Sequence, residues 1–216
     1  MTLPQPPGFL ALPPSGQGPG VLVLHAWWGL NETMKSFCGR LAAKGFVAFA
    51  PDFYDGRIAD TVEGARKLAG GLDEAKANAV IAGGVDFLSD RADKTGDGLG
   101  VVAFSLGVWF ALGLSVEDPD RVRRVVVFYG TRDGDYGRSK ASYLCHFAET
   151  DDFEPASSVR SMEDSIRAAG RPVAVHTYEG TGHWFLEPDR PDAYNEPAAK
   201  LAWERTAAFL GASPDR

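Results

Sequence analysis

The sequence predicts a single α/β domain in which a mostly parallel sheet carries helices on both faces. Short apolar runs alternate with longer helical patterns along the 216 residues, an order typical of parallel strands joined by crossover helices. Several short runs, such as Leu99–Phe104, are almost continuously apolar, as expected of strands that are covered on both faces. The chain is long enough for a sizeable core, and no repeat, linker or lid-sized insertion divides it. We therefore expect residues 1–216 to form one domain.

The expected strands begin with an edge strand that follows the Pro- and Gly-rich start of the chain. They are Phe9–Leu12, Val21–His25, Phe46–Ala50, Leu99–Phe104, Arg124–Tyr129, Tyr143–Phe147 and Val173–Tyr178. The expected helices are Glu32–Lys44, Leu72–Arg91, Leu106–Leu114, Ser157–Ala169 and Asp192–Leu210. We expect Ser157 to cap the fourth helix at its N-terminus and Gly170 to end it.

Composition excludes several classes of partner. The formal net charge is −7, and the basic residues are scattered, so we expect no binding to nucleic acid or to an anionic membrane. No segment approaches the length of a membrane span, and the start of the chain lacks the pattern of a signal peptide. A cytoplasmic protein, either a monomer or a homodimer, is the expectation. Cys38 and Cys145 are expected to be buried thiols, and no zinc spacing occurs.

Ser105 is the candidate nucleophile. It stands in Ala103-Phe104-Ser105-Leu106-Gly107, where an apolar strand runs directly into a helical pattern. A nucleophile elbow needs small residues two positions before and two after the nucleophile, because strand and helix come very close there. The helix N-terminus would also supply backbone N–H groups to a developing oxyanion. The alternative is that Ser105 is an ordinary helix N-cap.

In such an arrangement the histidine base follows the serine in the sequence and lies on a loop that is close to the serine in space. His146 and His176 lie inside expected strands, where a core or surface histidine is the better interpretation. His183 stands in the Gly-rich loop Gly180–Phe185, after the last strand and before the last helix. His183 is therefore the candidate base, and the alternative is a histidine that is merely exposed to solvent.

The acid that orients the imidazole is expected in the acidic segment after Tyr143–Phe147, which contains Glu149, Asp151, Asp152 and Glu154. Asp151 is the preferred candidate over its neighbours. Asp133, which follows the preceding strand, is a more distant rival, and the whole segment could also be a solvated loop.

With these residues in place, the chain resembles the dienelactone hydrolase family, which has an α/β-hydrolase fold. The resemblance spans about Val21 to Leu210 and is carried by the elbow around Ser105 and by the stretches HAWWGLN (25–31), APDFY (50–54), FYG (128–130), HFAETDDFEP (146–155), GTGHWF (180–185) and AWERT (202–206). In this family the acid lies in an Asp-x-x-x-Pro segment, which implies Asp151 with Pro155.

The resemblance implies hydrolysis of esters or lactones through an acyl-enzyme, without a cofactor. It also implies an oxyanion hole built from the backbone N–H groups of Leu106 and Trp27. The alternatives are a thioesterase or acyl transferase with the same triad, and a catalytically silent ligand-binding module, since fold does not dictate function.

Two positions depart from the family pattern. Well-known members use a cysteine nucleophile with a nearby glutamate, whereas this chain has Ser105 and, at the glutamate position, Ala26. Members that act on dienelactone bind its carboxylate with arginines, one of them four residues after the catalytic histidine. Glu187 stands there in this chain and would repel an anion, so we expect neutral substrates.

Aromatic residues gather around the expected mouth of the site. They favour an apolar pocket for a neutral acyl or aryl group, although core packing is an equally good interpretation. The expected pocket residues are Trp28, Phe53, Tyr54, Tyr129, Trp184, Phe185 and Glu187.

Overall fold

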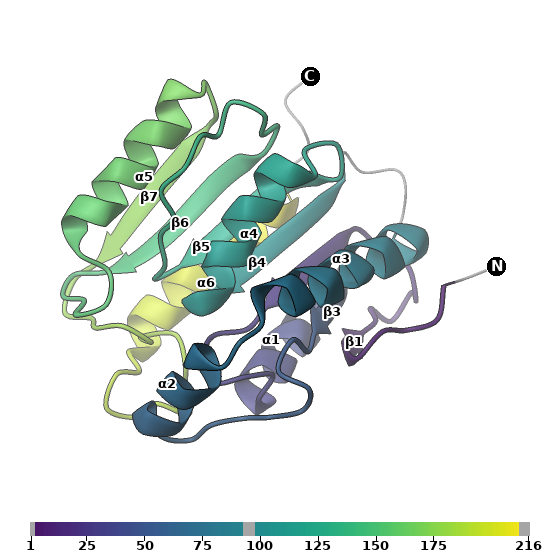
Figure 1. The fold of residues 1–216 in the computed structure, drawn as a ribbon, viewed down its shortest axis with the longest axis horizontal. Coiled ribbons are helices and arrows are strands. Elements are labelled where there is room, and N and C mark those ends of the chain that lie inside the picture. Colours follow the sequence, from purple (N-terminus) through teal and green to yellow (C-terminus); the bar gives the residue numbers. More distant parts are fainter. Residues whose placement is uncertain (1–2, 93–97, 212–216) are drawn as a thin grey trace.

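The computed structural model describes residues 3–92 and 98–211 (Figure 1). The strands are β1 (Gly8–Ala11), β2 (Gly20–Leu24), β3 (Val47–Pro51), β4 (Leu99–Phe104), β5 (Val122–Phe128), β6 (Ser142–Ala148) and β7 (Val173–Tyr178). The helices are α1 (Glu32–Ala43), α2 (Val62–Gly70), α3 (Glu74–Arg91), α4 (Leu106–Glu117), α5 (Ala156–Ala168) and α6 (Glu196–Gly211).

All seven strands belong to one sheet, in the order β1-β3-β2-β4-β5-β6-β7. Neighbouring strands are parallel except at the edge, where β1 runs antiparallel to β3 and pairs Phe9 with Ala50. The strand order reverses direction between β2 and β4, and the loops that follow these central strands meet at their carboxyl ends. In open α/β sheets this is the place where ligands bind.

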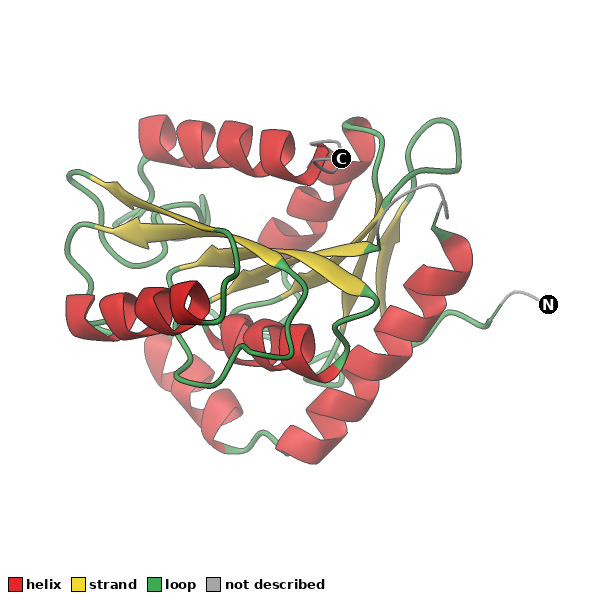
Figure 2. Cartoon of the chain, turned by 90° about the horizontal axis from the view of Figure 1, so that it is seen from above, coloured by secondary structure: helices red, strands yellow, loops and turns green. Residues whose placement is uncertain are grey.

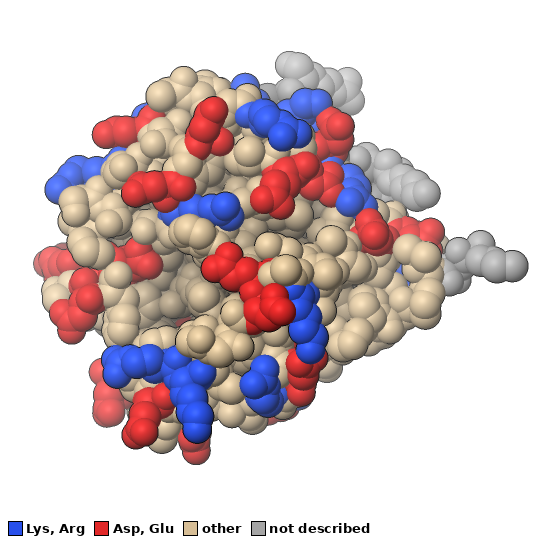
Figure 3. Space-filling view, viewed as in Figure 1, with Lys and Arg blue, Asp and Glu red and all other residues tan. Residues whose placement is uncertain are grey.

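Helices cover both faces of the sheet (Figure 2). Two clusters of buried apolar side chains pack in the core. One contains Phe37 of α1 and Trp203 of α6, whose rings meet edge to face at 5.2 Å. The other contains residues of α3, α4 and α5 such as Ile81, Phe110 and Met162. The central strands are buried along their whole length, which explains why they are almost entirely apolar. On the face shown in Figure 3, basic and acidic side chains are interspersed.

The predicted strands are all present, with ends that shift by no more than two residues. The helix α2 was not predicted, although Val62, Ala65 and Leu68 recur at helical spacing. It is nine residues long and buries only Ala65, so the pattern is short; Thr61 begins the helix by accepting a hydrogen bond from Gly64 N–H. α6 begins four residues later than predicted, at Glu196, where Asn195 Oδ1 accepts from Ala198 N–H.

The predicted cap of α5 is wrong. The helix begins at Ala156 after Pro155, and the cap position makes no side-chain hydrogen bond. Proline holds its φ near the helical value without a donor to satisfy, which suits the start of a helix. At the other end, Gly170 follows the last turn with φ 70°, a conformation that glycine adopts without strain. None of the described helices is long and apolar enough to cross a membrane.

Candidate active site

Ser105 lies in a sharp turn between β4 and α4. Its backbone angles are φ 47° and ψ −113°, a strained conformation of the kind that is found at functional sites. Ser105 N–H donates to the carbonyl of Phe128, and the Ser105 side chain makes no capping hydrogen bond to α4. The alternative of an ordinary N-cap is therefore wrong, and the hydroxyl is available for other contacts.

Gly107 makes this turn possible. A Cβ atom at Gly107 would lie 2.5 Å from the carbonyl oxygen of Leu24 and 2.8 Å from that of His25. Both neighbours are backbone atoms that cannot move aside cheaply, so α4 can approach the sheet only because residue 107 has no side chain. The small residue expected two positions after the nucleophile is thus required by close packing.

His183 reaches Ser105 from a loop 78 positions further along the chain. Its Nε2 lies 3.1 Å from Ser105 Oγ, and its Nδ1 lies 2.7 and 2.9 Å from the two oxygens of Asp151. An ionised carboxylate only accepts hydrogen bonds, so Nδ1 carries the proton and Nε2 is free to accept one from the serine. The structure therefore brings the three predicted residues into one hydrogen-bonded chain.

The Asp151 carboxylate is held by its own loop. Oδ1 accepts hydrogen bonds from the backbone N–H groups of Phe153 (2.9 Å) and Glu154 (3.0 Å). The side chains of Asp151 and His183 are 4% and 5% exposed, so solvent competes little for their contact. Thr150 N–H also donates to the carbonyl of Thr181, which joins the loop after β6 to the loop after β7 and fixes the spacing of acid and base.

The carboxylate bonded to His183 belongs to Asp151 and not to its rivals. Asp133 is exposed and lines a separate small pocket, and Asp152 is exposed and lines the His183 pocket. His146 is a core histidine, as expected: its Nδ1 and Nε2 lie within hydrogen-bonding distance of Tyr178 Oη and Thr206 Oγ1. Burial lowers the pKa of His146 to about 3.

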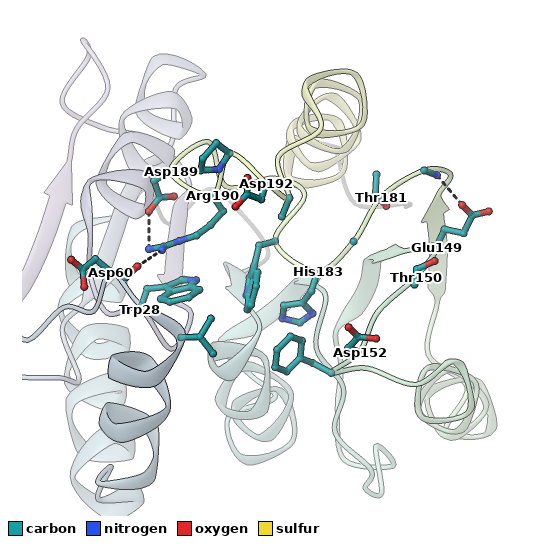
Figure 4. A pocket seen from close by; sticks show the side chains of 17 residues that line it. Trp28, Asp60, Glu149, Thr150, Asp152, Thr181, His183, Asp189, Arg190 and Asp192 are labelled. Carbon is teal, nitrogen blue, oxygen red and sulfur yellow. Dashed lines mark hydrogen bonds and ion pairs between the residues drawn. The ribbon is translucent and has the colours of Figure 1, made fainter.

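Two pockets open beside this chain of residues. The Ser105 pocket, about 500 Å³, is lined by residues that include Trp27, Ser105, Leu106, Trp109, Phe153 and Glu154. The His183 pocket, about 800 Å³, is lined by residues that include Trp28, Val62, Phe153, His183, Trp184 and Arg190 (Figure 4). Phe153 is shared by both and separates them.

The backbone donors expected for an oxyanion lie in the first of these pockets. Leu106 is the first residue of α4, and the first N–H groups of a helix have no partner inside it. Trp27 follows β2, the neighbour of β4 in the sheet. Both residues line the Ser105 pocket together with the hydroxyl that they would serve.

The expected pocket aromatics divide into two groups. Trp28 and Trp184 line the His183 pocket. The remaining four are buried core residues that line neither pocket, so their prediction as pocket residues is wrong: they are Phe53, Tyr54, Tyr129 and Phe185. Each packs against other rings of the core; Phe53, for example, stacks on His25 at 3.6 Å. The alternative of core packing holds for these four.

Glu187 was also expected in the pocket, and this prediction is wrong. Its side chain is fully buried, and its Oε1 accepts a 2.7 Å hydrogen bond from Tyr129 Oη. Burial raises the pKa of Glu187 to about 8, so the carboxyl is mostly uncharged near neutral pH. A buried neutral group cannot repel an anion in the pocket. The Tyr129 ring in turn lies 4.9 Å from the His183 ring, so Tyr129 and its partner Glu187 support the loop that carries His183.

Glu154 is the residue that the sequence did not single out. Its carboxyl accepts a 2.6 Å hydrogen bond from Thr131 Oγ1, and both residues line the Ser105 pocket. The available signal was its place three residues after Asp151. That spacing alone could not distinguish a pocket residue from a solvated carboxylate.

Comparison with known proteins decides the family. The family model described as "Dienelactone hydrolase family" matches residues 7–213. The chain belongs to the dienelactone hydrolase family. One curated relative, "Protein usf" of Aquifex pyrophilus, is 36% identical to this chain over 212 residues. The match covers 94% of this chain and 91% of the relative. A putative carboxymethylenebutenolidase of Aquifex aeolicus (strain VF5) is 32% identical, with the same shares of the two chains.

Solved structures confirm the α/β-hydrolase fold of this family member. A putative dienelactone hydrolase from Klebsiella pneumoniae superposes with a TM-score of 0.81 at 23% identity, covering 93% of this chain and 90% of the other. A propionate-bound thermophilic esterase from Thermogutta terrifontis has a TM-score of 0.68 at 15% identity, covering 95% of this chain and 91% of the other. Family membership places the protein among ester and lactone hydrolases.

Neither cysteine of this chain competes with Ser105 as the nucleophile. Cys38 and Cys145 are both buried and unpaired with each other, and burial raises the pKa of both thiols. Neither thiol lines the pockets beside Ser105 and His183. Ala26 is 1% exposed, and its methyl group contributes only packing. No cluster of metal-binding side chains occurs among the described residues.

Proposed function

We propose that this protein hydrolyses small carboxylic esters or lactones through an acyl-enzyme formed on Ser105. The observation that supports this best is the hydrogen-bonded chain from Ser105 Oγ through His183 to the Asp151 carboxylate. This is the arrangement by which a neutral hydroxyl becomes a nucleophile near neutral pH.

In the first half of the reaction, Ser105 Oγ attacks the ester carbonyl carbon while His183 Nε2 takes the hydroxyl proton. Asp151 stabilises the imidazolium that forms and keeps its proton on Nδ1. The tetrahedral intermediate then collapses, the bond to the alcohol oxygen breaks, and His183 Nε2 gives its proton to that oxygen. With a lactone, the alcohol stays tethered to the acyl group.

In the second half, a water molecule replaces the alcohol beside His183. Nε2 takes a proton from this water, its oxygen attacks the acyl carbon, and the proton returns to Ser105 Oγ as the acid leaves. Each tetrahedral intermediate carries a negative oxygen, which the N–H groups of Leu106 and Trp27 would stabilise. A donor of this kind contributes roughly 10²–10³ to turnover in well-studied hydrolases.

The two pockets support small substrates with apolar groups. The Ser105 pocket has the aromatic walls Trp27, Trp109 and Phe153, and such walls favour neutral acyl or aryl groups. In the His183 pocket, Arg190 lies 3.6 Å above the Trp28 ring and donates to the carbonyl of Asp60. Arg190 Nη2 also pairs with Asp189 at 3.3 Å, so part of the guanidinium is already bound within the protein.

Labelling with a fluorophosphonate tests the proposal. The probe should add once, at Ser105, and abolish hydrolysis of a neutral ester, and Ser105→Ala should not be labelled. A matched panel of esters, lactones and thioesters then identifies the preferred bond. Labelling at another residue, or full activity in Ser105→Ala, would overturn the proposal; turnover of thioesters alone would replace it by a thioesterase.

A further inference from the structure

Glu154 places an ionisable carboxyl in the pocket of the nucleophile. Its backbone N–H donates to Asp151 Oδ1 at 3.0 Å, and its side chain accepts from Thr131 Oγ1 at 2.6 Å. The first contact ties Glu154 to the acid of the hydrogen-bonded chain, and the second anchors its carboxyl to the loop after β5. Glu154 therefore has a defined position beside Ser105 rather than a free position on the surface.

The charge of this carboxyl changes near neutral pH. Burial is the main cause that raises the pKa of Glu154 to about 7, a value that already includes a lowering by the hydrogen bonds from Thr131 and a raising by the neighbouring Asp151 charge. Below this value Glu154 is neutral and can donate a hydrogen bond, and above it Glu154 carries a negative charge.

Other charged groups face Glu154 from the elements around it. Glu74, in the first turn of α3, lines the same pocket. On the opposite side, Glu149, Arg160 and Glu163 line a neighbouring cavity that Glu154 also borders. Arg132 stacks on Trp109 at 4.5 Å and donates to its carbonyl. Among the described residues no lysine or arginine lines the Ser105 pocket itself, so ionised Glu154 has no cation there to offset it.

The acyl group of a substrate would occupy this pocket. In the mechanism proposed above, the alcohol departs on the side of His183, because Nε2 must give it a proton. The acyl carbon is bound to Ser105 Oγ, so its chain would extend into the pocket that Ser105 lines together with Phe153 and Glu154.

We propose that Glu154 selects the charge of the acyl group, and that it does so differently on the two sides of neutral pH. This inference rests on the proposed function. Neutral Glu154 admits neutral and anionic acyl chains alike. Ionised Glu154 disfavours an acyl chain that ends in a carboxylate and favours one that ends in a quaternary ammonium group.

Three 4-nitrophenyl esters with acyl chains of equal length test this, one ending in methyl, one in carboxylate and one in trimethylammonium. The ratio of kcat/KM for each charged ester to that for the neutral ester cancels any pH dependence that the three reactions share, since all three use the same catalytic residues. From about pH 5.5 to about pH 8.5, the carboxylate ratio should fall on the order of tenfold and the ammonium ratio should rise, mainly through KM. The midpoint should lie near the pKa of about 7.

Glu154→Gln keeps an acceptor for Thr131 and removes the charge, so both ratios should become independent of pH. Glu74→Gln is the matched control, because it removes an exposed carboxylate from the same pocket and should leave the midpoint in place. Flat ratios in the wild type, or an unchanged profile in Glu154→Gln, would overturn the inference. Absence of any ester hydrolysis would overturn the proposed function instead.

Discussion

The ring of Phe153 lies 4.8 Å from the imidazole ring of His183, measured between centroids, and forms a wall of both pockets. It also contacts Trp27 at 5.5 Å and Trp184 at 5.2 Å. The backbone N–H of the same residue donates to Asp151. Phe153 is nevertheless 44% exposed, so its ring divides the two pockets without being locked in the core.

Removing this ring should merge the pockets. In Phe153→Ala, kcat/KM for an ester with a bulky branched acyl group should rise by roughly tenfold relative to the acetyl ester, since pocket shape is worth this much in apolar sites. Phe153→Leu is the control, because it keeps most of the volume and should change the ratio far less. An unchanged ratio in Phe153→Ala would show that Phe153 does not separate the acyl and alcohol groups.

Asp151→Asn should lower turnover by roughly 10⁴, because an amide cannot hold the imidazole proton on Nδ1 or stabilise the imidazolium. Asp133→Asn and Asp152→Asn are the controls. Both carboxylates are exposed, and neither bonds to His183, so each change should cost less than roughly tenfold. Steady-state kinetics with a neutral ester decides this. If Asp133→Asn instead loses most of its turnover, the catalytic acid lies after β5 and the assignment of Asp151 is wrong.

Gly107→Ala should destabilise the protein by more than about 2 kcal/mol, because the new methyl group meets backbone oxygens 2.5 and 2.8 Å away. Gly83→Ala, inside helix α3, is the control. Its methyl group would meet no atom within 4 Å, so the change should lie within about 1 kcal/mol. Urea unfolding of both variants measures the difference. Equal stabilities would mean that the elbow has more room than the structure shows.

Glu187→Gln should flatten part of the dependence of stability on pH. The pKa of Glu187 is about 8 in the folded protein, and an exposed glutamate in the unfolded chain ionises near pH 4.3. The folded state therefore holds the proton more tightly, and wild-type stability falls as pH rises between these values. The fall attributable to Glu187 should be on the order of a few kcal/mol.

The Gln variant keeps an acceptor for Tyr129 and has no proton to lose. The quantity to measure is the difference in unfolding free energy between wild type and Glu187→Gln, by urea titration at about pH 5 and about pH 8.5. Histidine titration cancels in this difference. We expect the unfolding free energy of Glu187→Gln, relative to that of the wild type, to be greater at the higher pH. If this difference does not change with pH, Glu187 is not buried in its protonated form.

The sequence by itself determined the strands, the family resemblance and the three residues of the hydrogen-bonded chain. Strands covered on both faces are almost entirely apolar, so β2 and β4 could be predicted directly from the sequence. The turn at Ser105 could also be predicted from the sequence, because α4 approaches the backbone of residues 24 and 25 so closely at Gly107 that no side chain fits there. α2 had a weaker signal, since its apolar spacing extends over only nine residues, of which only Ala65 is buried.

Only the tertiary structure decided which carboxyls and rings face the substrate. Glu187 and Glu154 are both acidic loop residues near a predicted site residue, yet the first is buried against Tyr129 and the second lines the pocket of Ser105. The physical reason is that whether a loop side chain is buried or faces a pocket depends on the other loops that pack against it. These loops come from distant parts of the sequence, as Thr131 and Glu154 do, and their packing leaves no periodic pattern along the chain.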